Sequence, residues 1–238
     1  METRTDEIAD GVFRLSTFVP GANIVFNQFV VRADQPLLFH TGLRALFPLV
    51  SDAVAEIVPL DQLRWVAFGH VEADECGAMN QFLAAAPNAT VAHGAIACIV
   101  QVNDLADRAP HPLANGDVLD LGGKRVRNID TPHIPHGWDA HVLYEETTRT
   151  LFCGDLFTRF GEGSPTTTED IVEVALEAEQ FGGPTALTAT TSSTIRQLAE
   201  LDVSTLALMH GPAFQGDCTK ALLELGDGYA HMLRAAAE

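Results

Sequence analysis

Residues 68–77 read Phe-Gly-His-Val-Glu-Ala-Asp-Glu-Cys-Gly, and the interpretation of the whole chain starts from this stretch. Four side chains of types that ligate metals lie close together in it: His70, Glu72, Asp74 and Glu75. In an extended segment, residues two apart point to the same side, so the first three can converge while Glu75 faces another way. Imidazole suits iron, zinc and copper, and several carboxylates shift the preference toward iron or manganese. The stretch therefore predicts half of the ligands of a two-metal centre.

The flanks of this stretch place it at the end of a strand. Residues 63–68 form an apolar run typical of a strand, and residues 78–86 have the composition of a helix. Asp74 and Glu75 alone are explained equally well as an acidic helix start, where the macrodipole favours carboxylates. A helix start does not explain the histidine and glutamate upstream, so the metal interpretation covers more of the stretch.

Three further segments carry ligand side chains in similar positions. The loop at residues 131–141 contains three histidines, of which one or two are expected to face a metal: His133, His136 and His141. Asp155 and His210 each follow an apolar, strand-like run, and a carboxylate among apolar neighbours needs a partner to be buried. Each such residue is more often structural when it occurs alone. Together they predict the other half of the centre from one or two of these histidines, Asp155 and His210.

Composition limits the class of protein. The chain has 238 residues, of which 47% are apolar and 19% charged, so we expect one packed domain over residues 1–238. A formal net charge of -18 disfavours nucleic acid and anionic membrane surfaces as partners. No apolar run approaches the roughly 20 residues that span a bilayer, and the acidic N-terminus is unlike a secretory signal. The four scattered cysteines are typical of reduced thiols, so a cytoplasmic location is expected.

Hydrophobic periodicity and Gly/Pro punctuation predict the order of strands and helices. Strands are expected at residues 11–17, 24–32, 36–40, 63–68, 90–92, 117–121, 124–130, 141–145, 150–153 and 204–209. Helices are expected at residues 43–57, 78–86, 95–105, 169–180, 192–201 and 218–237, with a polar loop or lid after Asp155 up to about residue 168. This order predicts an α+β fold in which two mixed sheets are sandwiched between helices.

The ligand pattern resembles a known superfamily. His70-x-Glu72-x-Asp74, a loop histidine, Gly154-Asp155 and Met209-His210-Gly211 are similar to the metal motifs of the metallo-β-lactamase superfamily. Glu72 stands where the hydrolases of that superfamily carry a second histidine, and this resembles the diiron domain of flavodiiron proteins. The resemblance runs from Asn23 to about Gly211 and implies an αββα sandwich.

The resemblance also implies the ligand set by position. One iron would be held by His70, Glu72 and His136, and the other by Asp74, Glu75 and His210, with Asp155 bridging the two. His136 is chosen over His133 because its spacing to Asp155 matches the family pattern. His133 and His141 are then expected in an outer shell or in the pocket.

Three features depart from the family pattern. Glu75 stands where the family usually has a histidine, which makes the second metal position richer in carboxylate. His40-Thr41-Gly42 replaces the usual Asp-Thr-Gly after an early strand, so an outer-shell carboxylate is missing. No flavin-binding segment is recognisable, so no flavodoxin domain and no flavin site are expected in this chain.

The resemblance implies a diiron protein that reduces dioxygen to water or nitric oxide to nitrous oxide. Without its own flavin, the chain would receive electrons from a separate flavoprotein or rubredoxin-like protein, or would bind dioxygen reversibly as a sensor. The surface of the domain could also form a homodimer, and the sequence does not decide this. The alternative is a metallo-hydrolase in which two zinc ions, or manganese ions, activate a water. The two glutamates at positions 72 and 75 favour iron.

Overall fold

The N-terminal half of the chain forms the first of two sheets. The computed structural model describes residues 1–236. Seven strands follow one another across this sheet in chain order: β1 (Thr3–Ala9), β2 (Val12–Val19), β3 (Ile24–Val31), β4 (Leu37–Phe39), β5 (Trp65–Ala67), β6 (Thr90–Gly94) and β7 (His111–Leu113). Neighbouring strands are antiparallel from β1 to β4 and parallel from β4 to β7. The parallel part brings the carboxyl ends of β4 and β5 to the same edge of the sheet.

The second sheet comes from the C-terminal half and is also mixed. Its strands lie in the order β12 (Thr166–Thr167), β14 (Ala213–Phe214), β13 (Thr205–Ala207), β11 (Thr150–Phe152), β10 (His141–Glu145), β9 (Arg125–Asp130) and β8 (Val118–Asp120). The central strands β11 and β13 run parallel and pair Phe152 with Ala207. Their carboxyl ends therefore meet side by side, and a metal-type side chain follows each of them.

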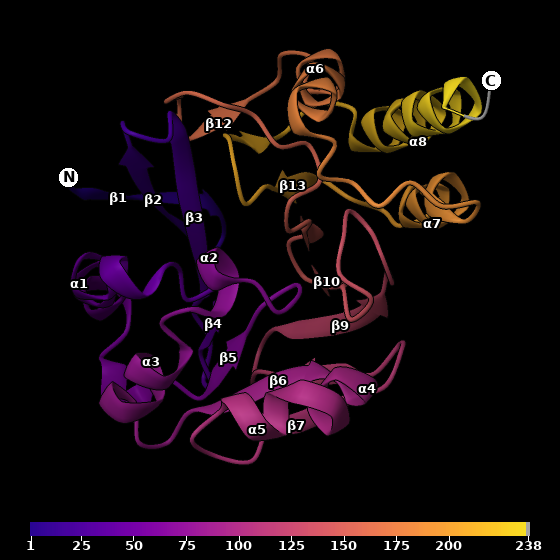
Figure 1. Cartoon of the computed structure of the whole chain (residues 1–238). Coiled ribbons are helices and arrows are strands. Elements are labelled where there is room, and N and C mark those ends of the chain that lie inside the picture. Colours follow the sequence, from indigo (N-terminus) through magenta and orange to yellow (C-terminus); the bar gives the residue numbers. More distant parts are fainter. Residues whose placement is uncertain (237–238) are drawn as a thin grey trace.

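Helices cover the outer face of each sheet (Figure 1). The first sheet packs against α1 (Phe47–Ile57) and α3 (Met79–Ala85), and the second against α6 (Val172–Gly182), α7 (Thr191–Leu198) and α8 (Cys218–Ala235). A third apolar cluster contains residues of both sheets, including Phe29, Phe39 and Phe152, and fills the space between them. The layers are thus helix, sheet, sheet and helix. Among the helices of residues 1–236, none combines the length and apolarity that a bilayer crossing requires.

Short helical segments complete the connections. They are η1 (Arg44–Leu46), η2 (Leu60–Gln62), α2 (Ala73–Cys76), α4 (Ala95–Ala97), η3 (Cys98–Val102) and α5 (Asn103–Leu105). The segment that we expected as one helix at residues 95–105 is therefore divided by the π-helical η3. α2 matters most for the site, because it starts inside the ligand-rich stretch at residues 68–77.

The predicted α+β sandwich of two mixed sheets between helices is confirmed. Four strands were not predicted: β1, β7, β12 and β14. β1 is an edge strand with a polar sequence, and β7 contains a proline at a sheet edge, so neither carries the apolar alternation that indicates a strand. β12 and β14 are only two residues long. The predicted C-terminal helix is observed to Ala235, and residue 237 lies outside the described residues.

Candidate metal centre

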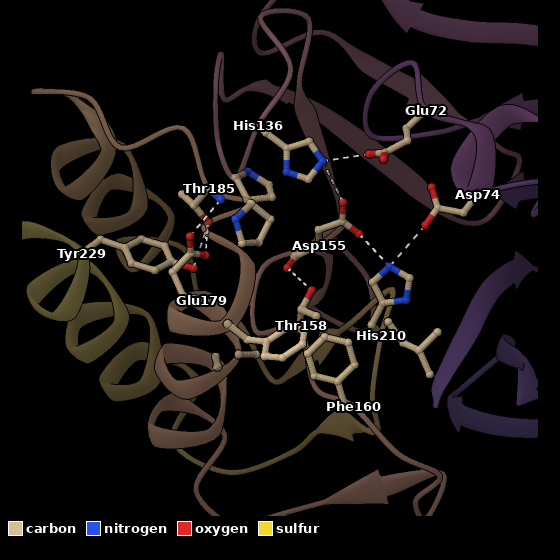
Figure 2. Close-up of a pocket in the computed structure, with 16 residues that line it drawn as sticks. Glu72, Asp74, His136, Asp155, Thr158, Phe160, Glu179, Thr185, His210 and Tyr229 are labelled. Carbon is tan, nitrogen blue, oxygen red and sulfur yellow. Dashed lines mark hydrogen bonds and ion pairs between the residues drawn. The ribbon is translucent and has the colours of Figure 1, made fainter. Parts of the chain in front are cut away.

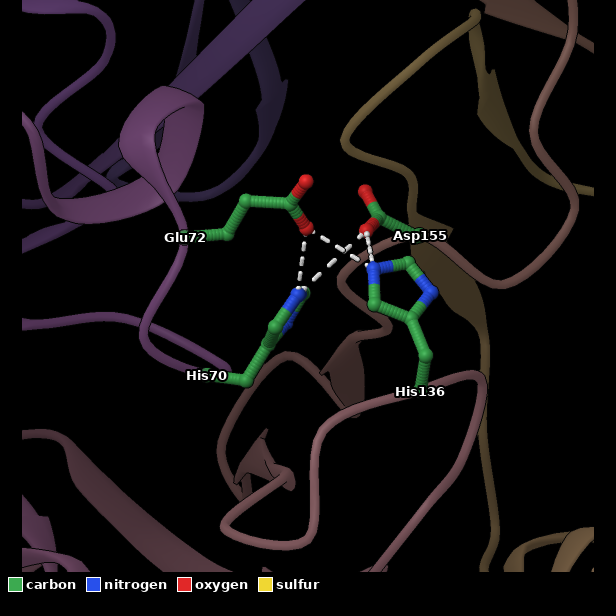
Figure 3. A group of neighbouring side chains, drawn as sticks. All are labelled: His70, Glu72, His136 and Asp155. Atoms are coloured by element: carbon green, nitrogen blue, oxygen red, sulfur yellow. Dashed lines mark hydrogen bonds and ion pairs between the residues drawn. The ribbon is translucent and has the colours of Figure 1, made fainter. Parts of the chain in front are cut away.

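Six of the seven predicted ligand residues approach one another where strands of both sheets end (Figures 2 and 3). They come from four loops, after β5, between β9 and β10, after β11 and after β13: His70, Glu72, Asp74, His136, Asp155 and His210. Three of the loops leave the fully buried strands β5, β11 and β13, and the fourth leads from β9 into the fully buried strand β10, so the sandwich fixes an end of each loop. Their assignment as metal ligands stays a prediction, and the geometry below shows how the groups are arranged.

Four of these residues form a first cluster around the carboxylate of Glu72 (Figure 3). Glu72 Oε2 lies 2.7 Å from His70 Nε2 and 2.8 Å from His136 Nε2. Asp155 Oδ2 lies 3.4 Å from the same nitrogen of His136 and 3.9 Å from that of His70. One ligand atom from each residue falls within 4.8 Å of all the others. Two imidazoles and two carboxylates thus converge on one position that suits a transition metal.

A second cluster shares Asp155 with the first. Its other oxygen, Oδ1, lies 3.2 Å from His210 Nε2, and Asp74 Oδ2 lies 3.3 Å from that nitrogen. His210 Nδ1 is 2.8 Å from the carbonyl oxygen of Val25 and donates its hydrogen to it. This bond leaves Nε2 free of a hydrogen when the ring is neutral, as a metal ligand must be. Asp155 therefore presents one oxygen to each cluster.

The charges of the two clusters fit a pair of cations. Burial lowers the pKa of His70, but the surrounding carboxylates, led by Glu75, outweigh it and raise the pKa to about 11. Burial likewise opposes the rise of the His210 pKa, which Asp155 and Asp74 bring to about 10. Asp74 Oδ1 and Asp155 Oδ1 are buried and accept no hydrogen bond from the described residues. Carboxylates that attract positive charge this strongly, with oxygens left over, form a donor set that suits two divalent or trivalent ions.

Glu75 is placed differently from the expectation that it faces the second ion. Its Oε2 accepts a hydrogen bond of 2.7 Å from the backbone N–H of His70. Its Oε1 lies 3.2 Å from His70 Nδ1 and 3.4 Å from His40 Nε2. The carboxylate is fully buried behind His70, and its contacts are not with Asp74 or His210. In this geometry Glu75 supports a ligand of the first cluster.

The backbone explains why Glu75 turns inward. The two-residue spacing rule assumes an extended chain, but α2 begins at Ala73. In a helical turn, successive side chains diverge by about 100°, so Asp74 and Glu75 point to different sides. Asp74 then faces His210, whereas Glu75 faces the interior of the sandwich. The helix-start interpretation thus holds for the backbone of this stretch, and the metal interpretation stays a prediction.

Neither of the two outer histidines of the 131–141 loop belongs to the clusters. His141 is buried in β10, where its Nε2 lies 2.7 Å from the carbonyl oxygen of Phe68 and its Nδ1 contacts the side chain of Asn128. Burial lowers the pKa of His141, so it acts as a neutral structural link under the ligand loop. His133 is exposed at a turn in which its N–H donates to the carbonyl of Gly137.

Two residues that the sequence did not single out hold the loops together. Asp139 Oδ2 accepts hydrogen bonds from the backbone N–H of Val71 and from Gln101 Nε2, at 3.0 and 2.8 Å. Gly137 has a φ of 80°, and a Cβ there would lie 3.1 Å from the Cβ of His70. Only glycine meets both conditions easily. The His136 loop is thereby fixed against the loop that carries His70 and Glu72.

A cavity of about 270 Å³ opens beside the two clusters. One wall carries the metal-type residues (Figure 2), and the lining also includes the exposed aromatic rings of Phe160 and Phe181, which contact each other. On the opposite wall, the Thr185 hydroxyl donates to Glu179 at 2.5 Å and lies 3.4 Å from the Tyr229 hydroxyl. Burial raises the pKa of Tyr229 to about 12, so its phenol keeps its proton at neutral pH. No sequence pattern indicates that Glu179, Thr185 and Tyr229 meet, because they come from segments that are far apart in the chain.

The fold and the two clusters define a metallo-β-lactamase-type domain of the flavodiiron class. The family model described as "ODP family beta lactamase" matches residues 24–211, and the chain belongs to this family. The predicted resemblance to the diiron domain of flavodiiron proteins is thereby confirmed.

Curated relatives share this class. The anaerobic nitric oxide reductase flavorubredoxin of Pectobacterium carotovorum is 29% identical over 136 residues, which cover 56% of this chain and 27% of the relative. The protein of the same name from Aeromonas hydrophila is 24% identical over 208 residues, which cover 84% of this chain and 42% of the relative. The chain thus matches less than half the length of these relatives.

Solved structures show the same fold. The rubredoxin oxygen:oxidoreductase of Desulfovibrio gigas matches with a TM-score of 0.82 at 15% identity, over 95% of this chain and 62% of the other. A metal-soaked Flv1 flavodiiron core from Synechocystis matches with a TM-score of 0.79 at 23% identity, over 98% and 61%. At this level of identity the match concerns the fold alone.

Proposed function

We propose that this chain is a non-haem diiron protein that binds dioxygen, or nitric oxide, and reduces it with electrons from a separate redox protein. The observation that carries the proposal is the position of Asp155 between two clusters, with Oδ2 toward His136 and Oδ1 toward His210. A carboxylate that serves two positions is suited to hold a pair of metal ions. The names of the relatives, which include nitric oxide reductases and an oxygen oxidoreductase, support the same reaction class.

The donor set favours iron over zinc. His70, His136 and His210 supply imidazole, and Glu72, Asp74 and Asp155 supply carboxylate, so that three imidazoles are matched by three carboxylates and no thiolate takes part. Such mixed sets suit iron and manganese. Two irons held in this way would supply the electron steps that a diatomic substrate needs. A hydrolase with two zinc ions is the outcome that metal analysis would reveal instead.

The cavity suits a small uncharged substrate. Its lining includes the side chains of Ile24, Pro135, Phe160, Ala178 and Phe181, and its far wall carries the Tyr229 phenol. Apolar surroundings favour the entry of uncharged gases. The reduction of dioxygen or nitric oxide consumes protons, and Tyr229 is a protonated hydroxyl that lines the cavity.

Rapid mixing tests this proposal. Iron-loaded protein is reduced under anaerobic conditions and mixed in a stopped-flow instrument with dioxygen, and separately with nitric oxide. Reduction predicts that the absorbance of the oxidised centre returns in step with the consumption of gas. Recovery of intact dioxygen when the gas pressure is lowered would show reversible binding, and the absence of any reaction with either gas would contradict the proposal.

A further inference from the structure

The carboxylate of Glu75 approaches His70 at two points from the side opposite the cluster. Oε2 accepts the His70 backbone N–H at 2.7 Å, and Oε1 lies 3.2 Å from Nδ1 of the ring. The other ring nitrogen, Nε2, faces Glu72 at 2.7 Å. The imidazole is therefore held between two carboxylates, and only Glu72 lies on the metal-facing side. Contacts of this kind fix both the orientation and the tautomer of a ligating histidine.

His40 lies behind Glu75 and completes the arrangement. His40 Nε2 is 3.4 Å from Glu75 Oε1, and both residues have no solvent exposure. Among the described residues, His40 Nε2 has no other polar partner, and Glu75 Oε1 has only His70 Nδ1 besides. Buried polar atoms are costly unless they are paired, so each atom is the polar partner of the other. His40 Nδ1 lies 3.3 Å from the carbonyl oxygen of Asn27, which anchors the ring to β3.

The backbone of the same turn holds Glu75 from a second direction. The backbone N–H of Thr41 donates to the Glu75 carbonyl at 2.6 Å, and the Thr41 hydroxyl donates to it at 3.2 Å. His40 itself has a φ of 64°, in the left-handed region that is unfavourable for a histidine. Such a conformation persists where the surroundings over-determine it. Residues 40 and 41 thus fix both the side chain and the main chain of Glu75.

Glycines leave room for the buried carboxylate. A Cβ on Gly69 would lie 3.1 Å from Glu75 Oε2, and a Cβ on Gly154 would lie 3.3 Å from Oε1. Gly154 directly precedes Asp155, so Glu75 contacts the base of two ligand loops. Larger residues at these glycines would push the carboxylate away from His70.

We propose that Glu75 and His40 form a positioning pair for His70, in which Glu75 holds Nδ1 of the ring and His40 holds Glu75. The inference rests on the proposed function only in treating His70 as a metal ligand. Glu75 is then a support for the first metal position and not a ligand of the second. The two departures from the family pattern at positions 40 and 75 are one local change, because these residues contact each other.

Glu75→Gln tests the pair without a change in shape. The glutamine amide nitrogen would face His70 Nδ1 and favour the tautomer with a hydrogen on Nε2, the nitrogen that must face the metal. We expect about two ions per chain to remain bound, with loss to a chelator roughly 10- to 100-fold faster than from the unchanged protein. Glu145→Gln is the matched control, because Glu145 is a buried glutamate whose contacts are with Thr147 and Thr148.

His40 variants test the second half of the pair. His40→Met removes the polar partner of Glu75 and should also accelerate metal loss, whereas His40→Gln can present an N–H at the same place and should restore most of the retention. The combination of His40→Met with Glu75→Gln should be no worse than Glu75→Gln alone, because both act through one contact. In the zinc-loaded protein, NMR should show the hydrogen-bonded Nδ1–H of His70 and its change in Glu75→Gln and His40→Met.

Three results would overturn the inference. Binding of only about one ion per chain by Glu75→Gln would make Glu75 a ligand of the second position. If Glu75→Gln retained its metal as well as the unchanged protein and showed the same His70 Nδ1–H signal, Glu75 would have no positioning role. If the effects of His40→Met and Glu75→Gln on metal loss were additive, His40 would not act through Glu75. The rates of metal loss are compared both in iron-loaded and in zinc-loaded protein. If the unchanged protein prefers zinc, the proposed diiron function is contradicted, but the test of Glu75 and His40 remains valid.

Discussion

Asp155 and His210 face each other because two parallel strands of the second sheet end in register. β11 and β13 pair Phe152 with Ala207, and the N–H of Met209 continues the pairing by donating to the carbonyl of Gly154 at 2.9 Å. Three residues beyond the last strand pair, Asp155 Oδ1 lies 3.2 Å from His210 Nε2. The relative position of the two groups is thus set by the hydrogen bonds of the sheet, and it joins the two clusters.

Asp155→Asn should disrupt both metal positions. The amide retains one oxygen but loses the negative charge that both clusters share, so we expect bound metal to fall from about two ions to fewer than one per chain. Asp74→Asn should remove only the second position and leave about one ion. Metal analysis after loading and desalting measures both. Asp202→Asn, on an exposed aspartate, serves as control, and equal losses from the two site variants would contradict the shared role of Asp155.

Metal uptake should strengthen as the pH rises. In the metal-free protein the pKa of His210 is about 10 and that of His70 about 11, so both rings are protonated at neutral pH. A ligating imidazole must lose that proton, and affinity should rise by up to about tenfold per pH unit for each proton displaced. Calorimetry in buffers of different ionisation enthalpy measures the protons released. His210→Gln should release fewer, and uptake without proton release would contradict the assignment.

The same shift predicts the stability of the metal-free protein. Because the pKa of His210 is raised in the folded state, its protonated form stabilises the fold fully below its ordinary value of 6.5. This contribution should be lost as the pH rises through about 10. Thermal unfolding of metal-free protein at several alkaline pH values measures the loss. The stability of His210→Gln should decline less over the same pH range. Equal declines in the variant and the unchanged protein would show that His210 does not cause the loss.

Tyr229→Phe should slow turnover and leave metal binding intact. The phenol lines the cavity opposite the clusters and keeps its proton at neutral pH, so its removal takes away a hydrogen-bond donor to a substrate in the cavity. Losses of roughly 10- to 100-fold are expected when one hydrogen bond to a charged group is removed. Gas consumption with a chemical reductant measures the rate, and metal analysis supplies the control. An unchanged rate would show that this hydrogen bond does not assist turnover.

Gly137→Ala should weaken the His136 loop. The residue has a φ of 80°, and an added Cβ would lie 3.1 Å from the Cβ of His70, so both backbone strain and a steric clash are expected. The free energy of unfolding should fall by about 1–3 kcal/mol. Chemical denaturation measures this change. Gly116→Ala is a matched control, because Gly116 has a φ of 86° but no atom within 4 Å of an added Cβ, and an equal fall in the free energy of unfolding in both variants would contradict the proposed clash.

Much of the candidate site could be predicted from the sequence because most of its ligand-type residues follow an apolar strand, and His136 lies in a loop that is rich in histidine, proline and glycine. The strands leave clear periodic signals, and the parallel edges of the sheets bring their ends together, so six predicted residues converge. The fold class follows from the same alternation of strands and helices. Edge strands such as β1 and β7 left no such signal, because polar residues and a proline interrupt the pattern.

Glu75 shows where prediction from the sequence reaches its limit. Its direction depends on whether the chain at Ala73 is extended or helical, and the short helix α2 decides this. Its partner His40 is 35 residues away in the sequence, and neither composition nor spacing indicates that the two are in contact. The cavity residues Glu179, Thr185 and Tyr229 likewise meet only through the packing of α6 and α8.

Metal content and its spectrum test the two-iron centre most directly. The protein is produced in medium that contains both iron and zinc, purified without added metal, analysed for metals, and examined by absorption before and after dithionite and then air. We predict about two iron ions per chain and a near-ultraviolet band that disappears on reduction and returns in air. Two zinc ions per chain without such a band would contradict the diiron centre and favour a hydrolase.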